Sequence, residues 1–210
     1  MVGTCSVRHE FQYTTFDIEF TNKNFHRNLS IKDDFGVCMA ALNYSGVILA
    51  SRAEEKNQDE YEDDCIEDDQ EDVDEMAKRR KNSNIMFHPF NEWKDVKAWN
   101  YELKNGESVE CLAIGSGWTA LQTNFNYIRI FSNDGIQKHL ICQGTSIVTM
   151  IGYENFLAVI YHAGPAFLGT QTMRVKIINM TTRDYRILID AECPASPNSI
   201  LTWVGFSEEG

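Results

Sequence analysis

The sequence predicts an all-β protein built from short strands that are joined by turns. Short apolar runs alternate with turn residues, and hairpin signals such as Ser45-Gly46 and Asn133-Asp134-Gly135 separate neighbouring runs. Most of these runs are too short for a helix, and several are rich in β-branched and aromatic residues. We expect strands within 39–42, 47–50, 85–87, 96–103, 109–114, 136–142, 147–151, 156–161, 173–178 and 185–189.

A recurring apolar run that ends in glycine indicates a repeated architecture. The runs VECLAIG, IVTMIG and ILTWVG end at Gly115, Gly152 and Gly205, which are 37 and 53 residues apart. One four-stranded propeller blade takes about 40 residues, so the first interval fits one blade and the second fits a blade with an insertion at 163–170. The sequence therefore predicts an incomplete WD40-like β-propeller of about three to four blades.

The burial pattern of a run predicts its place within a blade. Residues 156–161, with the sequence FLAVIY, are continuously apolar and fit an inner strand that is buried on both faces. Residues 173–177 alternate between apolar and basic side chains and fit an outer strand with one face in water.

An acidic segment divides the chain into three parts. Residues 54–81 carry 14 acidic and 5 basic side chains, and such a segment cannot bury enough apolar surface to order itself. We predict the first strands and blade in 1–53, a disordered acidic loop in 54–83, and further blades in 84–210, truncated at the start of a blade. The loop is either a tolerated insertion or a partner-binding element, since it lacks the ligand spacing and turn glycine of a calcium loop.

The acidic loop ends in a basic cluster. Lys78, Arg79, Arg80 and Lys81 form either a candidate nuclear localisation patch or the countercharge to the preceding acids. The net charge of −12 lies mainly in this loop, because the rest of the chain has 17 acidic and 14 basic residues. The nearly neutral remainder offers no electrostatic footprint for nucleic acid.

Composition and motifs exclude several classes of protein. No apolar run reaches the length of about 18 residues that a membrane span needs, and the first residues lack the apolar core of a signal peptide. The six cysteines are scattered without a CxxC pair, so we expect reduced thiols in the cytosol or nucleus. No catalytic motif or metal-ligand spacing appears, which predicts a protein without enzymatic activity or cofactors.

The stretch Gly115-Ser116-Gly117 raises the question of a phosphate-binding loop. Such a loop leads directly into a helix, whose first N–H groups face the anion. Here the strand-like stretch 118–123 follows. We therefore predict that these glycines, like Gly135, Gly152 and Gly205, permit turns.

The tryptophans and one histidine are further candidates for a structural or functional role. We expect tryptophans to anchor blade packing, and an exposed one to serve as an interface hot spot. His162, next to Tyr161 at a strand end, fits a hydrogen-bonded structural histidine better than a catalytic base or a metal ligand. The four tryptophans are Trp93, Trp99, Trp118 and Trp203.

A series of short motifs resembles one protein family. Through them the chain resembles the SepB-type central propeller of the eukaryotic replisome adaptor family. Its members are known in fungi as chromosome transmission fidelity or minichromosome loss proteins, and in animals as the acidic nucleoplasmic DNA-binding protein with WD repeats and an HMG box. The motifs are, in order, Asp17–Phe20, Phe90 with Trp93 and Trp99, Gly115 with Gly117 and Trp118, Arg129 with Phe131, Gly135, Gln137 and Lys138, Tyr161 with His162 and Gly164, and Trp203 with Gly205, Phe206 and Gly210.

The resemblance covers nearly the whole chain and implies a non-enzymatic scaffold. The family's propeller has six blades followed by a helical bundle, so this chain resembles a fragment of it. The family links the replicative helicase to DNA polymerase alpha, supports sister-chromatid cohesion and assembles as a homo-trimer, which implies a nuclear location. Its recognition of partner peptides belongs to the bundle, outside this sequence. The acidic loop stands where the family has a short strand connection, so its role does not carry over.

Two alternative functions remain open from the residues alone. The propeller would bind DNA or chromatin directly through Arg174, Lys176, Arg183 and Arg186, or it would be an unrelated cytosolic interaction scaffold. A steep salt dependence of DNA affinity distinguishes the first alternative. Exclusion from the nucleus distinguishes the second.

Overall fold

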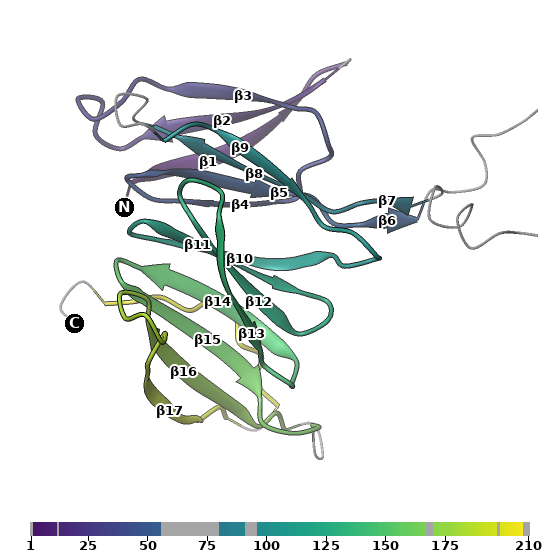
Figure 1. Ribbon diagram of the computed structural model, residues 1–210, viewed down its shortest axis with the longest axis vertical. Helices are drawn as coiled ribbons and strands as arrows, with labels where there is room; N and C mark the ends of the chain where they lie inside the picture. Colours follow the sequence, from purple (N-terminus) through teal and green to yellow (C-terminus); the bar gives the residue numbers. More distant parts are fainter. Residues whose placement is uncertain are drawn as a thin grey trace, which may run out of the picture.

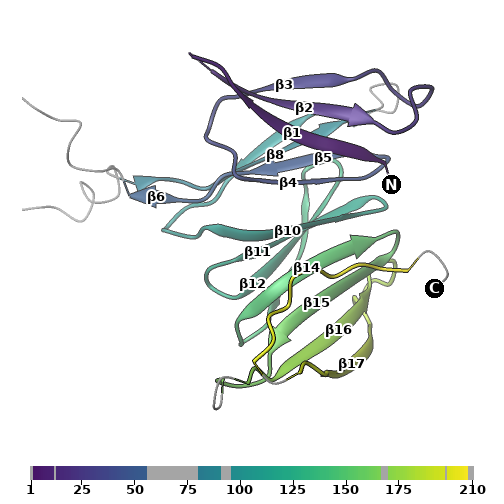
Figure 2. The ribbon, with the colours of Figure 1, turned by 180° about the vertical axis from the view of Figure 1, so that it is seen from behind.

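The protein is a stack of antiparallel sheets, as the computed structural model shows (Figure 1). The structure describes residues 2–11, 13–55, 80–90, 96–166, 170–196 and 198–207, and for Glu55 and Arg80 it describes the backbone alone. The described residues form three four-stranded sheets, one three-stranded sheet and a two-stranded ribbon. Figures 1 and 2 show the sheets following one another in chain order, with the N-terminal sheet at one end of the molecule. This arrangement is an open β-propeller, which confirms the predicted fold class.

Strand order within every sheet follows chain order. Most neighbouring strands therefore follow each other directly, as antiparallel strands can, whereas the acidic segment lies between β5 and β8 in the chain. The first sheet comprises β1 (Gly3–His9), β2 (Thr14–Phe20) and β3 (Leu29–Asp33). The second comprises β4 (Met39–Leu42), β5 (Gly46–Ala50), β8 (Asn84–Pro89) and β9 (Trp99–Glu102). The third comprises β10 (Val109–Gly115), β11 (Trp118–Thr123), β12 (Tyr127–Ser132) and β13 (Gln137–Cys142), and the fourth comprises β14 (Ile147–Tyr153), β15 (Phe156–His162), β16 (Met173–Asn179) and β17 (Ile187–Cys193).

Each pair of consecutive sheets encloses a hydrophobic core. Phe16 and Ile18 of the first sheet pack with Val47 and Leu49 of the second. The opposite face of the second sheet packs against the third, and the third packs against the fourth in the same way. Because a strand's side chains alternate between faces, one strand contributes to two cores. The second strands β5 and β11 are consequently buried along their whole length.

The fourth sheet corrects the predicted position of residues 173–177. These residues lie in β16, which is the third strand, whereas the outer position belongs to β17. Arg174 and Lys176 lie opposite Glu192 and Asp190 of β17, so their charges face a neighbouring strand. The prediction that FLAVIY is buried on both faces is confirmed, because residues 157–161 of β15 are all buried.

The predicted strand at 185–189 begins later in the structure, at Ile187. Tyr185 has a φ of 46°, in the left-handed region that a strand does not use. Its N–H donates to the carbonyl of Thr182, and the hydroxyl of Thr182 accepts the N–H of Arg186. This turn ends before Ile187 and delays the strand.

The acidic segment enters and leaves the second sheet through the two-stranded ribbon of β6 (Glu54–Glu55) and β7 (Arg80–Lys81). Figure 1 shows this ribbon projecting from the side of the sheets. The predicted disordered loop spans residues 54–83, but its ends Glu54–Glu55 and Arg80–Lys81 form this ribbon, so the prediction is wrong there. Residues 56–79, which include Lys78 and Arg79 of the basic cluster, lie outside the described residues.

Candidate interaction surface

An open groove with a volume of about 840 Å³ lies on the described part of the chain. It lies where the first strands of successive sheets turn back into the second strands. Turns from three sheets, the start of β1 and the last described residues therefore converge on one surface. The lining residues are Val2, Gly3, Leu42, Asn43, Tyr44, Ser45, Ile114, Ser116, Ile151, Gly152, Tyr153, Glu154, Trp203, Gly205 and Phe206.

Exposed aromatic side chains dominate this groove. Tyr44 is 63% exposed, Tyr153 is 41% exposed and Trp203 is 77% exposed. Tyr153 stacks on Phe206 with ring centroids 5.7 Å apart, and Tyr44 meets Phe25 edge to face at 5.3 Å. Aromatic side chains bring large contact areas at low entropic cost, so they are frequent hot spots of protein interfaces. The groove therefore has the chemistry of a protein-binding surface.

The glycine stretch at the groove is a turn between β10 and β11, as predicted, and leads into a strand. A Cβ on Gly115 would overlap the indole of Trp118. Trp118 is buried, and its Nε1–H donates to the carbonyl of Glu154 at 3.0 Å. The N–H of Ser116 donates to the same carbonyl at 2.6 Å. These bonds fix the third sheet to the fourth, so the stretch has a packing role.

Gly117 and Gly135 have the left-handed backbone conformation that is typical of glycine in turns. Their φ angles are 81° and 78°, in the region where residues with a Cβ are strained. Gly135 also lies against the indole of Trp99, and its N–H donates to the carbonyl of Ser132 at 3.0 Å. The stretch Asn133-Asp134-Gly135 is thus the hairpin turn between β12 and β13.

Trp99 anchors the second sheet to the third. Its ring stacks on Phe87 and on Phe131, with centroids 5.8 and 5.6 Å apart. Its Nε1–H donates to the carbonyl of Asn133 at 2.8 Å. This agrees with the predicted packing role, while Trp93 lies outside the described residues.

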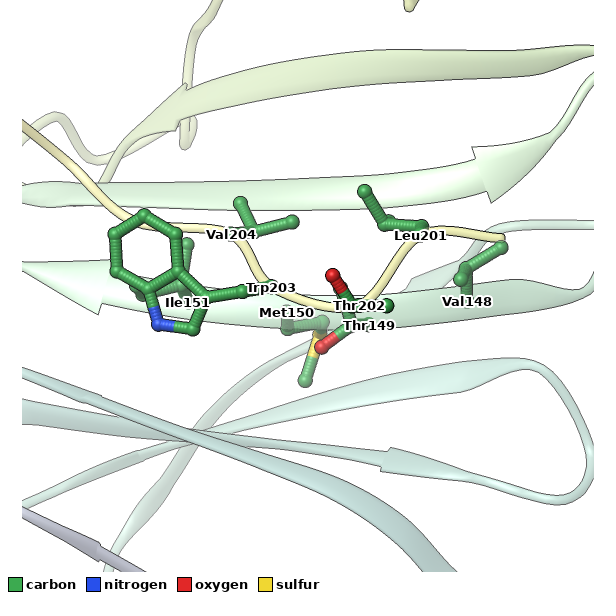
Figure 3. A pocket seen from close by; sticks show the side chains of 8 residues that line it. All are labelled: Val148, Thr149, Met150, Ile151, Leu201, Thr202, Trp203 and Val204. Atoms are coloured by element: carbon green, nitrogen blue, oxygen red, sulfur yellow. The ribbon is translucent and has the colours of Figure 1, made fainter. Parts of the chain in front are cut away.

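Trp203 differs from the other described tryptophans because it is exposed. Residues 201–204 run along β14 and enclose a second hollow of about 340 Å³ with residues 148–151 (Figure 3). A Cβ on Gly205 would overlap the Trp203 ring, so the glycine lets the ring fold back over the chain. Trp203 therefore fits the alternative interpretation of an interface residue.

Tyr161 belongs to a polar network on the fourth sheet. Its hydroxyl donates to Asp190 Oδ1 at 2.8 Å, and Arg174 Nε donates to the same oxygen at 2.9 Å. Burial, followed by the hydrogen bond to Asp190, raises the pKa of Tyr161. The hydrogen bonds from Tyr161 and Arg174 lower the pKa of Asp190. The network holds β15, β16 and β17 together.

His162 lies at the end of β15, where its N–H donates to the carbonyl of Ser146 at 2.9 Å. His162 also lines an open, mainly apolar hollow together with Thr145, Pro165 and Ala166. No group of three or more His, Cys, Asp or Glu side chains is placed to hold a metal ion within the described ranges. His162 is consequently not part of a metal-ligating group in that part of the chain.

Two of the four basic residues of the alternative DNA site form side-chain interactions within the fold, which leaves them less able to contact phosphate. Arg174 is engaged by Asp190, and Lys176 donates to Gln143 Oε1 at 2.8 Å while lying 4.9 Å from the centroid of the Tyr161 ring. Arg183 and Arg186 are exposed near the turn that precedes β17. The four residues therefore do not present one continuous field of free charge.

The sequence did not single out Phe25, Tyr44 or Tyr153 as site residues. Tyr44 stands between Asn43 and Ser45 in a hairpin turn, and Tyr153 follows the repeat glycine Gly152. An aromatic residue at a turn, where burial is hard to achieve, is the signal that would have found them.

The fold defines an open β-propeller protein. Residues 1–210 match the family described as "Minichromosome loss protein, Mcl1, middle region". The chain belongs to this family, and the resemblance drawn from its motifs is confirmed.

Relatives are found in animals and plants. The chain is 27% identical over 209 residues to "WD repeat and HMG-box DNA-binding protein 1" of Mus musculus, covering all of this chain and 17% of that protein. It is 31% identical over 183 residues to "Protein ENHANCER OF LHP1 1" of Arabidopsis thaliana, covering 86% of this chain and 16% of that protein. The chain thus spans about one sixth of the length of these relatives.

A solved structure of Hsv2p from Kluyveromyces lactis also aligns with the chain. The identity is 12%, the TM-score is 0.41, and the alignment covers 90% of this chain and 50% of that one.

Among the described residues no helix is long and apolar enough to cross a membrane.

Proposed function

We propose that this chain is a non-enzymatic scaffold region of a nuclear DNA-replication adaptor. The adaptor links the replicative helicase to DNA polymerase alpha and supports sister-chromatid cohesion. The observation that carries the proposal is the family match, which extends over residues 1–210. The open propeller fold supports it, because propellers present several loops on one surface while the sheets remain rigid.

The aromatic groove is the surface that we assign to partner contact. Tyr44 lies in the turn between β4 and β5, and Tyr153 is the last residue of β14, so a partner that touches both bridges two sheets. Hot spots cluster where aromatic anchors lie at the centre of a well-packed contact. The homo-trimer implied by the resemblance would place such surfaces in several copies, and any contact with DNA or chromatin would then be made through partners.

Co-purification from nuclear extracts tests this function. The intact protein carrying an affinity tag should recover helicase subunits and DNA polymerase alpha, and it should be found on chromatin in S phase. Absence from S-phase chromatin, or exclusion from the nucleus, would contradict the proposal and favour a cytosolic scaffold.

Paired variants test the groove itself. Tyr44→Ser with Tyr153→Ser should lower partner recovery at least fivefold, because two exposed aromatic anchors are lost. Ile136→Ser is the matched control, since Ile136 is 56% exposed and lies outside the groove. Equal recovery by both variants would show that partners bind elsewhere.

A further inference from the structure

The loop between β2 and β3 carries basic side chains and no acidic one. Residues 21–28 have the sequence TNKNFHRN, in which Lys23 and Arg27 are both exposed. Neither forms an ion pair within the described ranges. The Lys and Arg side chains in the strands of this sheet, Arg8 and Lys32, are each paired with an aspartate. The loop therefore presents positive charge that the fold does not neutralise.

Two exposed aromatic rings lie beside these charges. Phe25 is 37% exposed, and its ring meets that of Tyr44 edge to face, with centroids 5.3 Å apart. The β2–β3 loop and the β4–β5 turn therefore form one surface across two sheets, and Figures 1 and 2 show both connections at the same end of their sheets. Phe25 is two residues from each of the basic side chains. We call Lys23, Phe25, Arg27 and Tyr44 the basic aromatic surface.

A buried ring and two hydrogen bonds hold the loop in shape. Phe20 is buried, and its ring contacts those of Phe25 and His26 with centroids 5.6 and 5.2 Å apart. The N–H of Phe25 donates to the carbonyl of Asn22 at 3.0 Å, and the N–H of Asn24 donates to Asn22 Oδ1 at 3.0 Å. A surface that is ordered before binding loses less conformational entropy when a partner arrives.

The turn that carries Tyr44 is fixed to the third sheet. Asn43 Nδ2 donates to the carbonyl of Gly115 at 2.7 Å, and Asn43 Oδ1 accepts the N–H of Ser45 at 2.7 Å. The residues on either side of Tyr44 are thus held, while its own ring is left exposed. Both aromatic side chains of the surface consequently stand on backbone that is already ordered.

We propose that the basic aromatic surface binds an acidic peptide segment of a partner protein, in which carboxylates flank an aromatic or aliphatic side chain. The guanidinium of Arg27 holds one carboxylate through two parallel hydrogen bonds, and Lys23 supplies a point charge for another. The apolar side chain packs on Phe25 and Tyr44, as aromatic anchors do at hot spots. Tyr44 also lines the aromatic groove, so this inference rests on the proposed partner contact and names the partner's chemistry.

The charges favour a peptide over a strand of nucleic acid. A nucleic acid carries a negative charge at every phosphate, and its affinity comes from many basic contacts. The basic aromatic surface offers two Lys or Arg side chains on a chain whose net charge is −12, which repels a long polyanion. A short segment with two carboxylates needs only those two partners.

A random peptide library displayed on phage tests the partner's chemistry without choosing a sequence in advance. The 210-residue chain is the target, and peptides that also bind the charge-reversed variant Lys23→Glu with Arg27→Glu are removed. The remaining peptides should be enriched in Asp or Glu next to Phe, Tyr, Leu or Ile. Enrichment of neutral or basic peptides, or no enrichment, would overturn the proposal.

Fluorescence anisotropy with an enriched peptide then locates the binding surface. Lys23→Glu with Arg27→Glu should weaken binding at least tenfold, because both charge-assisted contacts are lost. Lys104→Glu with Lys138→Glu is the matched control, since it changes the net charge equally at two exposed positions outside the loop. The uncharged variant Lys23→Ala with Arg27→Ala should also weaken binding more than this control does. Equal weakening by the two Glu double variants would overturn the proposal.

Two further outcomes separate this inference from its alternatives. Binding of single-stranded polythymidine with a steep salt dependence, lost in Lys23→Glu with Arg27→Glu, would overturn it in favour of nucleic acid. The same variant should also recover fewer partner proteins from nuclear extracts. If its recovery is unchanged while Tyr44→Ser with Tyr153→Ser loses recovery, the proposed partner contact stands and the acidic-peptide inference is overturned.

Discussion

At the scale of the residue, close contacts leave no room for a Cβ at the repeat glycines, and at Gly152 the contact is with the neighbouring sheet. Gly152 lies in β14, and a Cβ there would overlap the carbonyl of Ile114 and approach the ring of Trp118 to 2.9 Å. The backbone cannot yield as a flexible side chain would. The glycine of the repeat therefore marks positions where another group lies too close to leave room for a Cβ.

Gly152→Ala should lower the free energy of unfolding by about 1–3 kcal/mol, the usual cost of an overpacked site. Urea denaturation with a circular dichroism signal measures the change. Gly164→Ala is the matched control, because a Cβ at Gly164 meets nothing within 4 Å. An equal loss in both variants would contradict the close-approach explanation.

Asp190 should make stability depend on pH. Its pKa in the folded protein is lowered from 3.8 by the hydrogen bonds from Tyr161 and Arg174. A lowered pKa means that the unfolded state binds the proton more tightly, so the stabilisation is present above pH 3.8 and is lost as pH falls through the folded value. Asp190→Asn should be less stable than the wild type at pH 7 and should approach it in acid. A stability difference that stays constant from pH 7 to pH 3 would contradict this.

At the scale of the element, an ion pair joins the link before β10 to β12. Arg129 Nε and Nη2 donate to the two carboxylate oxygens of Glu107 at 2.8 and 2.6 Å. The Glu107 side chain is only 6% exposed and that of Arg129 is 18% exposed. Breaking a buried pair leaves one charge without compensation, which costs more than removing both.

Arg129→Met should therefore destabilise the protein by about 3–5 kcal/mol. The double variant Arg129→Met with Glu107→Met should recover most of that loss, as a double-mutant cycle by urea denaturation would show. If the double variant is as unstable as the sum of the two single variants, the pair is not coupled and the assignment is wrong.

The sequence predicted most of the strands from β4 onward but did not locate β1, β2 or β3. Runs such as 39–42 and 109–114 became β4 and β10 because apolar periodicity and turn residues are local signals. β1, with the sequence GTCSVRH, has no buried residue and no apolar run, so no local signal marks it as a strand. The site was predicted only in part, because the burial of Trp118 and the exposure of Trp203 depend on which sheets lie against them, and the local sequence does not show this.

At the scale of the whole molecule, the charge distribution favours proteins over nucleic acid as partners. The chain carries a net charge of −12, and two of the four basic residues of the alternative DNA site are engaged within the fourth sheet. We expect no measurable affinity of the 210-residue chain for duplex DNA at 150 mM salt. Fluorescence anisotropy over a salt series measures this, and a steep loss of affinity with rising salt would instead support direct DNA binding.

The place of the acidic segment in the second sheet has a consequence for proteolysis. The segment leaves after β5 and returns before β8, and these two strands are hydrogen-bonded neighbours. A single cut within residues 56–79 would break the polypeptide but leave that pairing and both adjoining cores in place. The nicked protein should migrate as one species under native conditions and as two fragments in denaturant. Two independently expressed halves, ending and starting in this segment, should likewise assemble into one molecule.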